Sequence, residues 1–418
     1  MAYLGSGSQP RPKRPKILGQ DTVSPRAAQV AQDMLNRFAR AGERRFRFEK
    51  IIGEGSAGVT FKMRMKEEGE EEEEEGQTPS LYKTPSSQTP VRRFVMKRSL
   101  NAQAERNLKQ EIEVLERFKA SMHVSRPFYI DDGKLESTLS YMDGPTLLTE
   151  WIEGGLLYDF IQRLGDRDQP LPNRMLWRFF LCFCRFLVAM AWPPDGDGSA
   201  AVVETMPNPN AHGVRPPMSR LLHGDLNHRN VMIDAFESIE HSRVPLLKLI
   251  DFGGSRDLPS NDKQPADLAV KTNMLYIGQI MLTLIGGSHL GGSANMNIAI
   301  DGEDKVIKSY ARDIDGLNPS YQAPPALVAR HKDKMDNLDP RIRSLVARCC
   351  ALSSTDRPDI EDLLDTVEAA VRTTKKDYYS GYKYFANESD HALERLSREL
   401  LFDADSIGIS LAGLSLGP

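Results

Sequence analysis

Residues 223–234 read HGDLNHRNVMID and combine a polar loop with the start of an apolar strand. Asp225 and Asn230 stand five positions apart, and a second apolar strand pattern, LLKLID, ends at Asp251. Oxygen ligands of this kind are what phosphate-bound Mg²⁺ prefers. We therefore expect Asn230 and Asp251 to bind Mg²⁺, and Asp225 to orient an attacking hydroxyl or accept its proton.

Length and composition indicate an ordinary globular protein. The 418 residues are 40% hydrophobic and 27% charged, without an apolar run of about 18 residues or a signal-like N-terminus. We predict an intracellular, cytoplasmic protein that does not contact membranes. The cysteines form two close pairs with no His at zinc-site spacing, so we expect reduced core thiols at Cys182, Cys184, Cys349 and Cys350.

Charge is uneven along the chain. The net charge is -4, but residues 67–75 alone hold eight Glu, so the overall acidity says little about partners. We expect no nucleic-acid partner, and no pattern indicates an oligomeric state. A basic cluster near the N-terminus is either a nuclear localisation signal or a solvated tail; it comprises Arg11, Lys13, Arg14 and Lys16.

The domain organisation follows from changes in composition and period. Residues 1–23 are expected to be a disordered basic tail, and residues 24–42 a helix with Ser24 as N-cap and Pro25 at the first position. One domain is expected over residues 46–372, followed by a tail, 373–418, whose apolar patch at 392–401 packs back. Its parts are an N-terminal part, 46–153, with a disordered acidic insert, 66–92, and a C-terminal part, 154–372, with a polar insert, 193–217.

Three glycines form G-x-G-x-x-G between two strand patterns: Gly53, Gly55 and Gly58. Because a strand containing Thr60 follows them, the pattern favours a glycine-rich hairpin over a dinucleotide-binding turn. Such a loop can close its backbone amides over phosphates, although surface turns also contain glycine.

Lys97 ends the apolar strand RRFVMK, and a helix over 102–119 presents Glu111 on its apolar stripe. A Lys97–Glu111 pair would direct the Lys toward phosphates, whereas Glu113 should point outward; a plain surface Lys is the alternative. The strand TLLTEWIEGG then reaches a Gly-Gly break. Backbone groups near Glu150 and Ile152 would meet a purine edge, unless this is an ordinary strand end.

Taken in order, these motifs resemble those of the eukaryotic protein kinases over about residues 46–372. The resemblance implies an α+β, two-lobed fold, with a β-rich N-lobe, a mostly helical C-lobe, and ATP and Mg²⁺ between them. It also implies transfer of the ATP γ-phosphate to a Ser or Thr hydroxyl of a protein. The implied roles are ATP binding by Gly53, Gly55, Gly58, Thr60, Lys97, Glu111, Thr149 (the gatekeeper position), Glu150 and Ile152, catalysis by Asp225 and Lys97, and Mg²⁺ binding by Asn230 and Asp251.

Several residues depart from the kinase pattern. Gly224 replaces the Arg of HRD, and Asn227 replaces the Lys that contacts the γ-phosphate. No A-P-E motif precedes YIGQIM, Asn273 stands where an Asp usually begins that helix, and Arg357 lacks its usual Glu partner. Two alternatives therefore stay open. HGDLNHRN also resembles the loop of aminoglycoside and choline kinases, which act on small molecules, and a pseudokinase scaffold would bind without chemistry.

Overall fold

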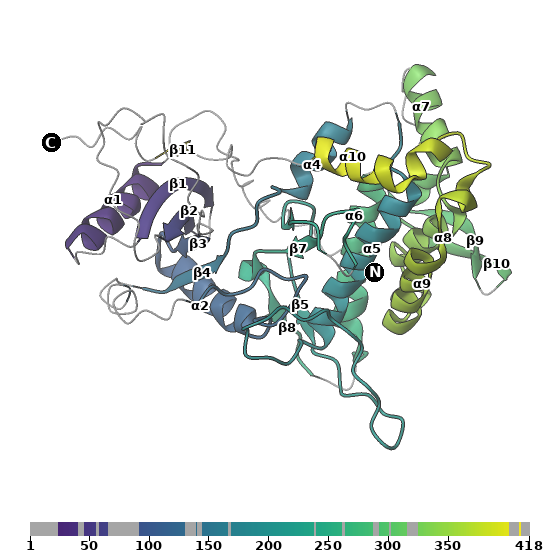
Figure 1. The fold of residues 1–418 in the computed structure, drawn as a ribbon. Helices are drawn as coiled ribbons and strands as arrows, with labels where there is room; N and C mark the ends of the chain where they lie inside the picture. The colour runs from purple at the N-terminus through teal and green to yellow at the C-terminus, as the bar shows by residue number, and fades with distance from the viewer. Residues whose placement is uncertain are drawn as a thin grey trace, which may run out of the picture. The chain divides into compact units, whose positions relative to one another are not determined.

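The computed structural model has a mixed α+β fold, with an N-terminal antiparallel sheet followed by a mainly helical region (Figure 1). The chain divides into two compact units: unit 1 holds residues 1–112, 127–151 and 405–418, and unit 2 holds residues 113–126 and 152–404. The basic tail and residues 66–91 of the acidic insert lie outside the described residues. The structure describes residues 24–40, 46–55, 58–65, 92–129, 139, 144–165, 169–237, 240–260, 264–286, 292–300, 302–315, 325–400 and 409–410.

Unit 1 is built on one antiparallel sheet with the strand order β11-β1-β2-β3-β4. Helix α2 begins in this unit, and its last residues belong to unit 2. The elements are α1 (Pro25–Arg40), β1 (Phe46–Gly55), β2 (Gly58–Met65), β3 (Arg92–Arg98), α2 (Ala102–Glu116), β4 (Thr146–Glu150) and β11 (Ile409–Ser410).

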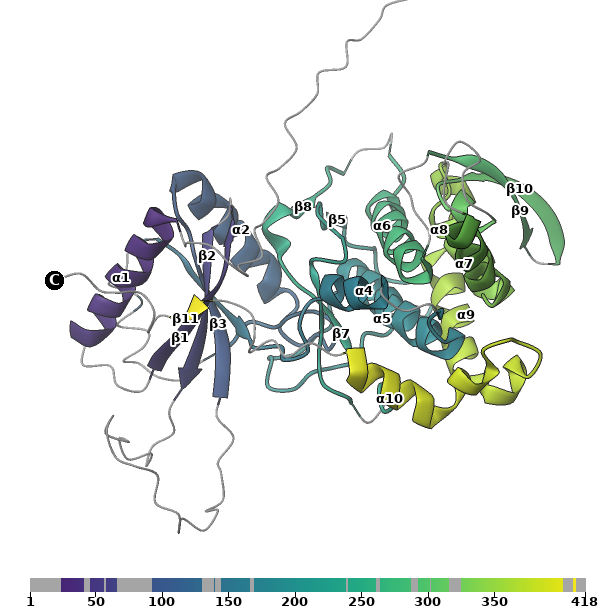
Figure 2. The ribbon, with the colours of Figure 1, turned by 90° about the horizontal axis from the view of Figure 1, so that it is seen from above.

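The predicted N-terminal helix is confirmed as α1. The Ser24 hydroxyl accepts a hydrogen bond from the Ala27 N–H (3.1 Å), which is the expected N-cap. The helix ends at Arg40, and Gly42 lies outside the described residues. Its apolar stripe joins the core of unit 1, where Phe38 contacts Phe48 edge to face with 5.1 Å between the ring centroids. Figure 2 draws α1 and α2 on opposite sides of the sheet.

Alternation in the sequence predicts that one face of the first strand carries Phe46, Phe48, Lys50 and Ile52 and the other carries Arg47, Glu49 and Ile51, which is wrong at the end of the strand. Ile51 is buried and Ile52 is only partly buried, the reverse of the expected order. The register between β1 and β2 shifts between Phe48 and Lys50, and again between Ile51 and Gly53. An extra residue at each irregularity moves the following side chains to the other face of the sheet.

Unit 2 is mainly helical, with short two-stranded sheets. Its elements are α4 (Leu157–Gly165), α5 (Asn173–Ala191), β5 (Leu221–Leu222), β6 (Val231–Ile233), β7 (Leu247–Leu249), η1 (Phe252–Gly254), β8 (Arg256–Asp257), α6 (Leu268–Ile285), β9 (Ala294–Ile300), β10 (Glu303–Ser309), η2 (Arg312–Ile314), α7 (Pro325–Asp336), α8 (Pro340–Cys349), η3 (Ser354–Asp356), α9 (Ile360–Thr373), η4 (Lys376–Tyr379), η5 (Phe385–Glu388) and α10 (Asp390–Leu400).

Helix α5 is the centre of unit 2. Every residue in it except Arg178 is buried, so the core encloses this helix on all sides. Helices α6 and α9 pack against it. Among the described helices, α6 alone is long and apolar enough to cross a membrane, and 67% of that stretch is buried inside the protein. Gly278 allows the close approach of α6 to α8, because a Cβ there would lie 2.8 Å from the Cβ of Cys349.

Three parts of unit 2 differ from the sequence-based expectations. Strands β9 and β10 form a hairpin inside a region expected to be helical. The polar insert at 193–217 contributes the buried Glu204, so it is partly core. The third part is the tail, which does pack back, as predicted: α10 belongs to unit 2 and buries Leu393 and Leu396.

Candidate functional site

The loop before β6 holds Asp225 between two amides. The Asn230 side-chain amide donates to Asp225 Oδ2 (2.9 Å) and to its backbone carbonyl (2.8 Å). The Asn227 amide donates to Asp225 Oδ1 (2.8 Å). Asn227, which stands where the kinase pattern has Lys, therefore gives Asp225 a second hydrogen-bond donor, so both carboxylate oxygens are oriented.

Strands β6 and β7 bring the predicted Mg²⁺ ligands together. Val231 pairs with Leu249, and the Ile250 N–H donates to the Asn230 carbonyl (2.9 Å), so Asn230 and Asp251 leave the same end of the hairpin. Asp251 has φ 60°, and it is the only non-glycine residue with positive φ in the described part of the chain. Such backbone strain is concentrated at functional positions.

Burial and neighbouring charge shift the pKa of Asp225 in the opposite direction to its hydrogen bonds. Partial burial, followed by the nearby charge of Asp251, raises the pKa of Asp225, although hydrogen bonds from Asn230 and Asn227 oppose the shift. Both aspartates are exposed, so they are accessible to ligands from solvent.

The buried His223 supports the loop that holds Asp225. Burial lowers the pKa of His223 to about 4, so the ring is neutral near pH 7. Its Nδ1 accepts a hydrogen bond from the Asp225 N–H (3.3 Å), and its Nε2 lies 3.3 Å from the Ile250 carbonyl. This assigns the proton to Nε2, and one ring ties the loop before β6 to the segment after β7.

Gly224, the main departure from HRD, has a structural cause. Its φ is +80°, and a Cβ at this position would lie 2.1 Å from the Gly254 carbonyl oxygen. A side chain such as Arg cannot enter without moving the segment after Asp251. A glycine is therefore required at position 224 for the loop that holds Asp225 to pack against the segment after Asp251.

Two further departures form structural contacts. Asn273 lies inside α6, which begins five residues earlier than its expected start, and it accepts from the His223 N–H (3.2 Å) and donates to the Leu221 carbonyl (2.9 Å). Arg357 donates to the carbonyls of Ala351 (3.0 Å) and Lys271 (2.8 Å). Asn273 thus anchors the loop of Asp225, and backbone carbonyls accept the Arg357 hydrogen bonds in the absence of the usual Glu.

Unit 1 contains the predicted Lys–Glu pair. Lys97 Nζ lies 2.8 Å from Oε2 and 3.1 Å from Oε1 of Glu111, and the Glu111 side chain is only 3% exposed. Glu113 is exposed, as expected. Thr60 lies opposite Lys97, and Gly53 lies opposite Thr60, so the three residues form one row across β1, β2 and β3.

The three glycines of the hairpin differ in what they require. A Cβ on Gly58 would lie 2.1 Å from the Arg98 carbonyl oxygen, so close strand packing explains that glycine. A Cβ on Gly53 would meet nothing nearer than Thr60 at 3.9 Å. Gly55 pairs with Gly58 at the end of the hairpin. Packing therefore does not explain why residue 53 is a glycine. That Gly53 lets the backbone approach a ligand remains a prediction.

The predicted purine-binding segment spans the passage between units. Thr149 and Glu150 end β4 in unit 1, where they pair with Val95 and Phe94, and Ile152 begins the next segment of unit 2. Gly154 then donates its N–H to the Ile233 carbonyl (2.9 Å), and a Cβ there would lie 2.4 Å from that oxygen. Contact with β6 explains this glycine without a ligand.

One polar cluster was missed by the sequence analysis. The four cysteines are free and buried, as predicted, but Cys182 does have histidine neighbours. His241 Nε2 lies 3.8 Å from its Sγ, and His241 Nε2 lies 3.2 Å from His123 Nε2. The three residues, named here the His-Cys-His cluster, are each 59 positions from the next, a spacing that no short metal-binding motif contains.

Comparison with known proteins adds no relative. No protein-family model matches the chain, and a search of curated proteins finds no match.

Proposed function

We propose that this protein is an ATP- and Mg²⁺-dependent phosphotransferase, and most specifically a Ser/Thr protein kinase of divergent sequence. The observation that carries the proposal is the group at the end of β6 and β7, where the amides of Asn227 and Asn230 orient the exposed Asp225 near the exposed Asp251. Both carboxylates are exposed, and Asp251 lies on a left-handed backbone of the kind that is concentrated at functional positions.

Each residue has a role that its contacts allow. Asn230 uses its amide N–H₂ on Asp225, so its oxygen is the atom suited to Mg²⁺, and Asp251 would supply the anionic ligand. Bound Mg²⁺ would neutralise phosphate charge during transfer. Asp225 would orient the acceptor hydroxyl and receive its proton, which its raised pKa favours.

Lys97 and Glu111 would form the phosphate-binding part of unit 1. Glu111 holds the ammonium group in place, as a partner does in phosphotransferases that rely on positioning and electrostatics. Neither His228 nor Arg229 is a strong substitute for the missing loop Lys. The His228 ring stacks on the Tyr158 ring with 5.5 Å between the centroids, and the Arg229 guanidinium carbon lies 4.4 Å from the Tyr158 ring centroid. Both side chains are therefore held against Tyr158.

The glycine-rich hairpin, the Gly-Gly break and the TDRPDI stretch favour a protein acceptor. A small-molecule acceptor, as in aminoglycoside and choline kinases, is favoured by the short segment between Asp251 and the start of α6 at Leu268. The pseudokinase alternative rests on Asn227, which provides no positive charge for the γ-phosphate.

The test is transfer of labelled phosphate from ATP by the purified chain, with Mg²⁺, to a protein mixture and to a panel of small alcohols and aminoglycosides. Asp225→Asn is the inactive variant, and Asp304→Asn, which makes the same change at an exposed residue of β10, is the matched control. We expect label on proteins with wild type and Asp304→Asn only. Label on a small molecule would replace the protein-kinase assignment. Nucleotide binding without transfer would indicate a pseudokinase.

A further inference from the structure

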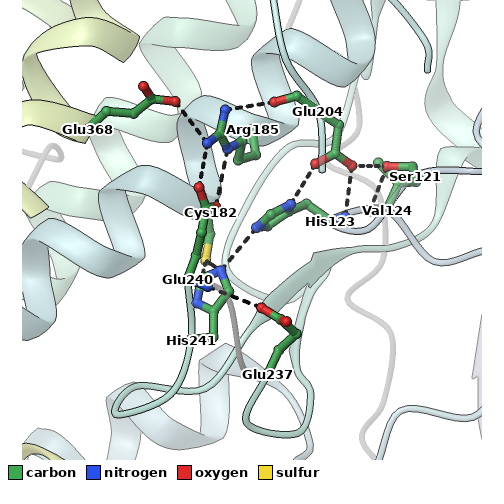
Figure 3. Close-up of polar contacts among 10 residues, drawn as sticks. All are labelled: Ser121, His123, Val124, Cys182, Arg185, Glu204, Glu237, Glu240, His241 and Glu368. Carbon is green, nitrogen blue, oxygen red and sulfur yellow. Dashed lines mark hydrogen bonds and ion pairs between the residues drawn. The ribbon is translucent and has the colours of Figure 1, made fainter. Parts of the chain in front are cut away.

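The His-Cys-His cluster is buried inside unit 2, and Figure 3 shows the polar contacts around it. His123, Cys182 and His241 are all 0% exposed, and one ligand atom from each lies within 4.8 Å of the others. The three come from the segment after α2, from α5 and from the connection between β6 and β7. Separate parts of the chain therefore place two imidazoles and a thiol around one point.

The outer nitrogen of each imidazole is already occupied. His123 Nδ1 lies 2.6 Å from Glu204 Oε2, and the same carboxylate accepts hydrogen bonds from the His123 N–H (2.8 Å) and the Ser121 hydroxyl. The His241 ring also interacts with the backbone of Val244, and because its Nε2 faces His123, Nδ1 is the nitrogen left for that interaction. An acceptor on one ring nitrogen directs the lone pair of the other toward a metal, as in carboxylate–histidine–zinc arrangements.

The spacing of the ligand atoms fits a tetrahedral ion. Nitrogen ligands about 2.0–2.1 Å from zinc are about 3.3 Å apart, and a nitrogen and a sulfur at about 2.3 Å are about 3.6 Å apart. The two Nε2 atoms are 3.2 Å apart, and His241 Nε2 is 3.8 Å from Cys182 Sγ. Cys182 Sγ also lies 3.9 Å from His241 Nδ1, so zinc binding would require the thiol to move toward the Nε2 side of the ring.

Charge balance also favours a divalent ion. Zinc with the Cys182 thiolate and the Glu204 carboxylate sums to zero, which a fully buried site requires. The nearby Arg185 does not disturb this sum, because it has its own carboxylates, Glu240 (2.5 Å) and Glu368 (2.8 Å), as Figure 3 shows.

We propose that His123, Cys182 and His241 form a structural zinc site supported by Glu204. Binding would release two protons to solvent, the Cys182 thiol proton and the proton held between the two Nε2 atoms, and a water would take the fourth position. Because the site is buried, its role would be to hold segments together. The His123 carbonyl accepts from the Leu249 N–H (2.8 Å), so the ion would support the strand that leads to Asp251.

A metal-free arrangement makes a different demand. One proton would have to lie between the two Nε2 atoms, and His123 Nδ1 and Glu204 Oε2 would share a second one. That arrangement gives Cys182 no role, whereas the zinc site uses all three residues. Loss of the thiol therefore separates the two.

The experiment measures metal in the full-length chain after expression with zinc and removal of loosely held ions. We expect about one zinc per chain in the wild type and in Cys184→Ala, and little in Cys182→Ala. Cys184 is the matched control because it is an equally buried thiol two residues away on α5 and is not part of the cluster. Replacement by Co²⁺ should give thiolate-to-cobalt absorption and tetrahedral visible bands in the wild type and Cys184→Ala only.

Removal of zinc by a chelator should lower the melting temperature of the wild type and of Cys184→Ala, and its return should restore it. Folded wild-type protein that holds neither zinc nor cobalt would overturn the proposal, even if Cys182→Ala fails to fold. Cobalt spectra that survive in Cys182→Ala, or exclusive loading with copper, would overturn the assignment.

Discussion

The two ends of the β6–β7 hairpin carry similar polar groups in opposite environments. At one end, Asn230 and Asp251 leave the strands beside the exposed Asp225. At the other end, the connection brings the fully buried His241 against His123, which pairs with Glu204. Carboxylates and nitrogen or amide donors occur at both ends, so residue type alone does not distinguish them.

The difference shows how exposure divides function from stability. Exposed carboxylates can meet a nucleotide and its Mg²⁺, and their charge is of use only when a ligand arrives. A buried carboxylate must be paired in the folded protein, and removing its partner costs stability. We therefore expect changes at the open end to affect phosphotransfer and changes at the buried end to affect unfolding.

The largest expected effect is at Asp251. Asp251→Asn keeps the left-handed backbone, which Asn tolerates, and removes the anionic Mg²⁺ ligand. Phosphotransfer should fall by roughly 10²–10⁴-fold, while the melting temperature changes little. Steady-state kinetics across Mg²⁺ concentrations and a thermal melt check both parts; normal turnover would remove Asp251 from the site.

Glu204→Gln tests the buried end. The substitution keeps the shape but removes the charge that faces His123, so unfolding should become easier by about 3–5 kcal/mol. The phosphotransfer rate per folded molecule should stay near that of wild type. Denaturant unfolding and activity are measured in parallel. A fall in activity without a fall in stability would contradict the assignment of a structural role to the buried end.

Gly224→Ala tests the contact between the two loops at the open end. The Cβ would overlap the Gly254 carbonyl at 2.1 Å, in addition to the unfavourable positive φ. A loss of about 1–3 kcal/mol is expected, together with reduced activity. Gly213→Ala is the control, because it has φ +75° with nothing within 4 Å. Equal losses in both variants would show that the backbone angle matters and the contact does not.

His223→Phe tests the titration of the buried ring. The pKa of His223 is about 4 in the folded protein and 6.5 for an ordinary His. The unfolded chain binds the extra proton, so this contribution to stability is present above pH 6.5 and is lost as pH falls through 4. His223→Phe should weaken the pH dependence of unfolding over that window. An unchanged slope in urea titrations at several pH values would place the acid sensitivity elsewhere, for instance at His241.

The smallest expected stability effect is at Gly53, where the comparison extends to unit 1. Gly53→Ala has room for its Cβ, so its free energy of unfolding should stay within about 0.5 kcal/mol. ATP affinity should fall, because the backbone could no longer approach phosphates closely. Gly58→Ala should instead lower stability through its overlap with the Arg98 carbonyl. Unchanged ATP binding by Gly53→Ala would mean that the glycine has no ligand role.

Local patterns predicted much of the architecture. The Ser24-Pro25 start of α1, the strand carrying Lys97, the helix carrying Glu111 and the apolar side of α10 all follow from short-range periodicity, and the structure contains them. The pattern was misleading where an irregularity changed the register, as in β1, and where a hairpin replaced helix, as in β9 and β10. Such features depend on pairing partners that a single segment does not contain.

The sequence by itself determined which residues carry charge, hydrogen-bond donors and conformational freedom: Asp225, Asn230 and Asp251 in strand-flanked loops, and Lys97 and Glu111 on adjacent elements. Only the tertiary structure decided why Gly224 is a glycine, that Asn227 orients Asp225, and that His123, Cys182 and His241 meet. The physical reason is distance along the chain. Burial and exposure arise when segments 59 positions apart pack together, and periodicity within one segment does not reveal that packing.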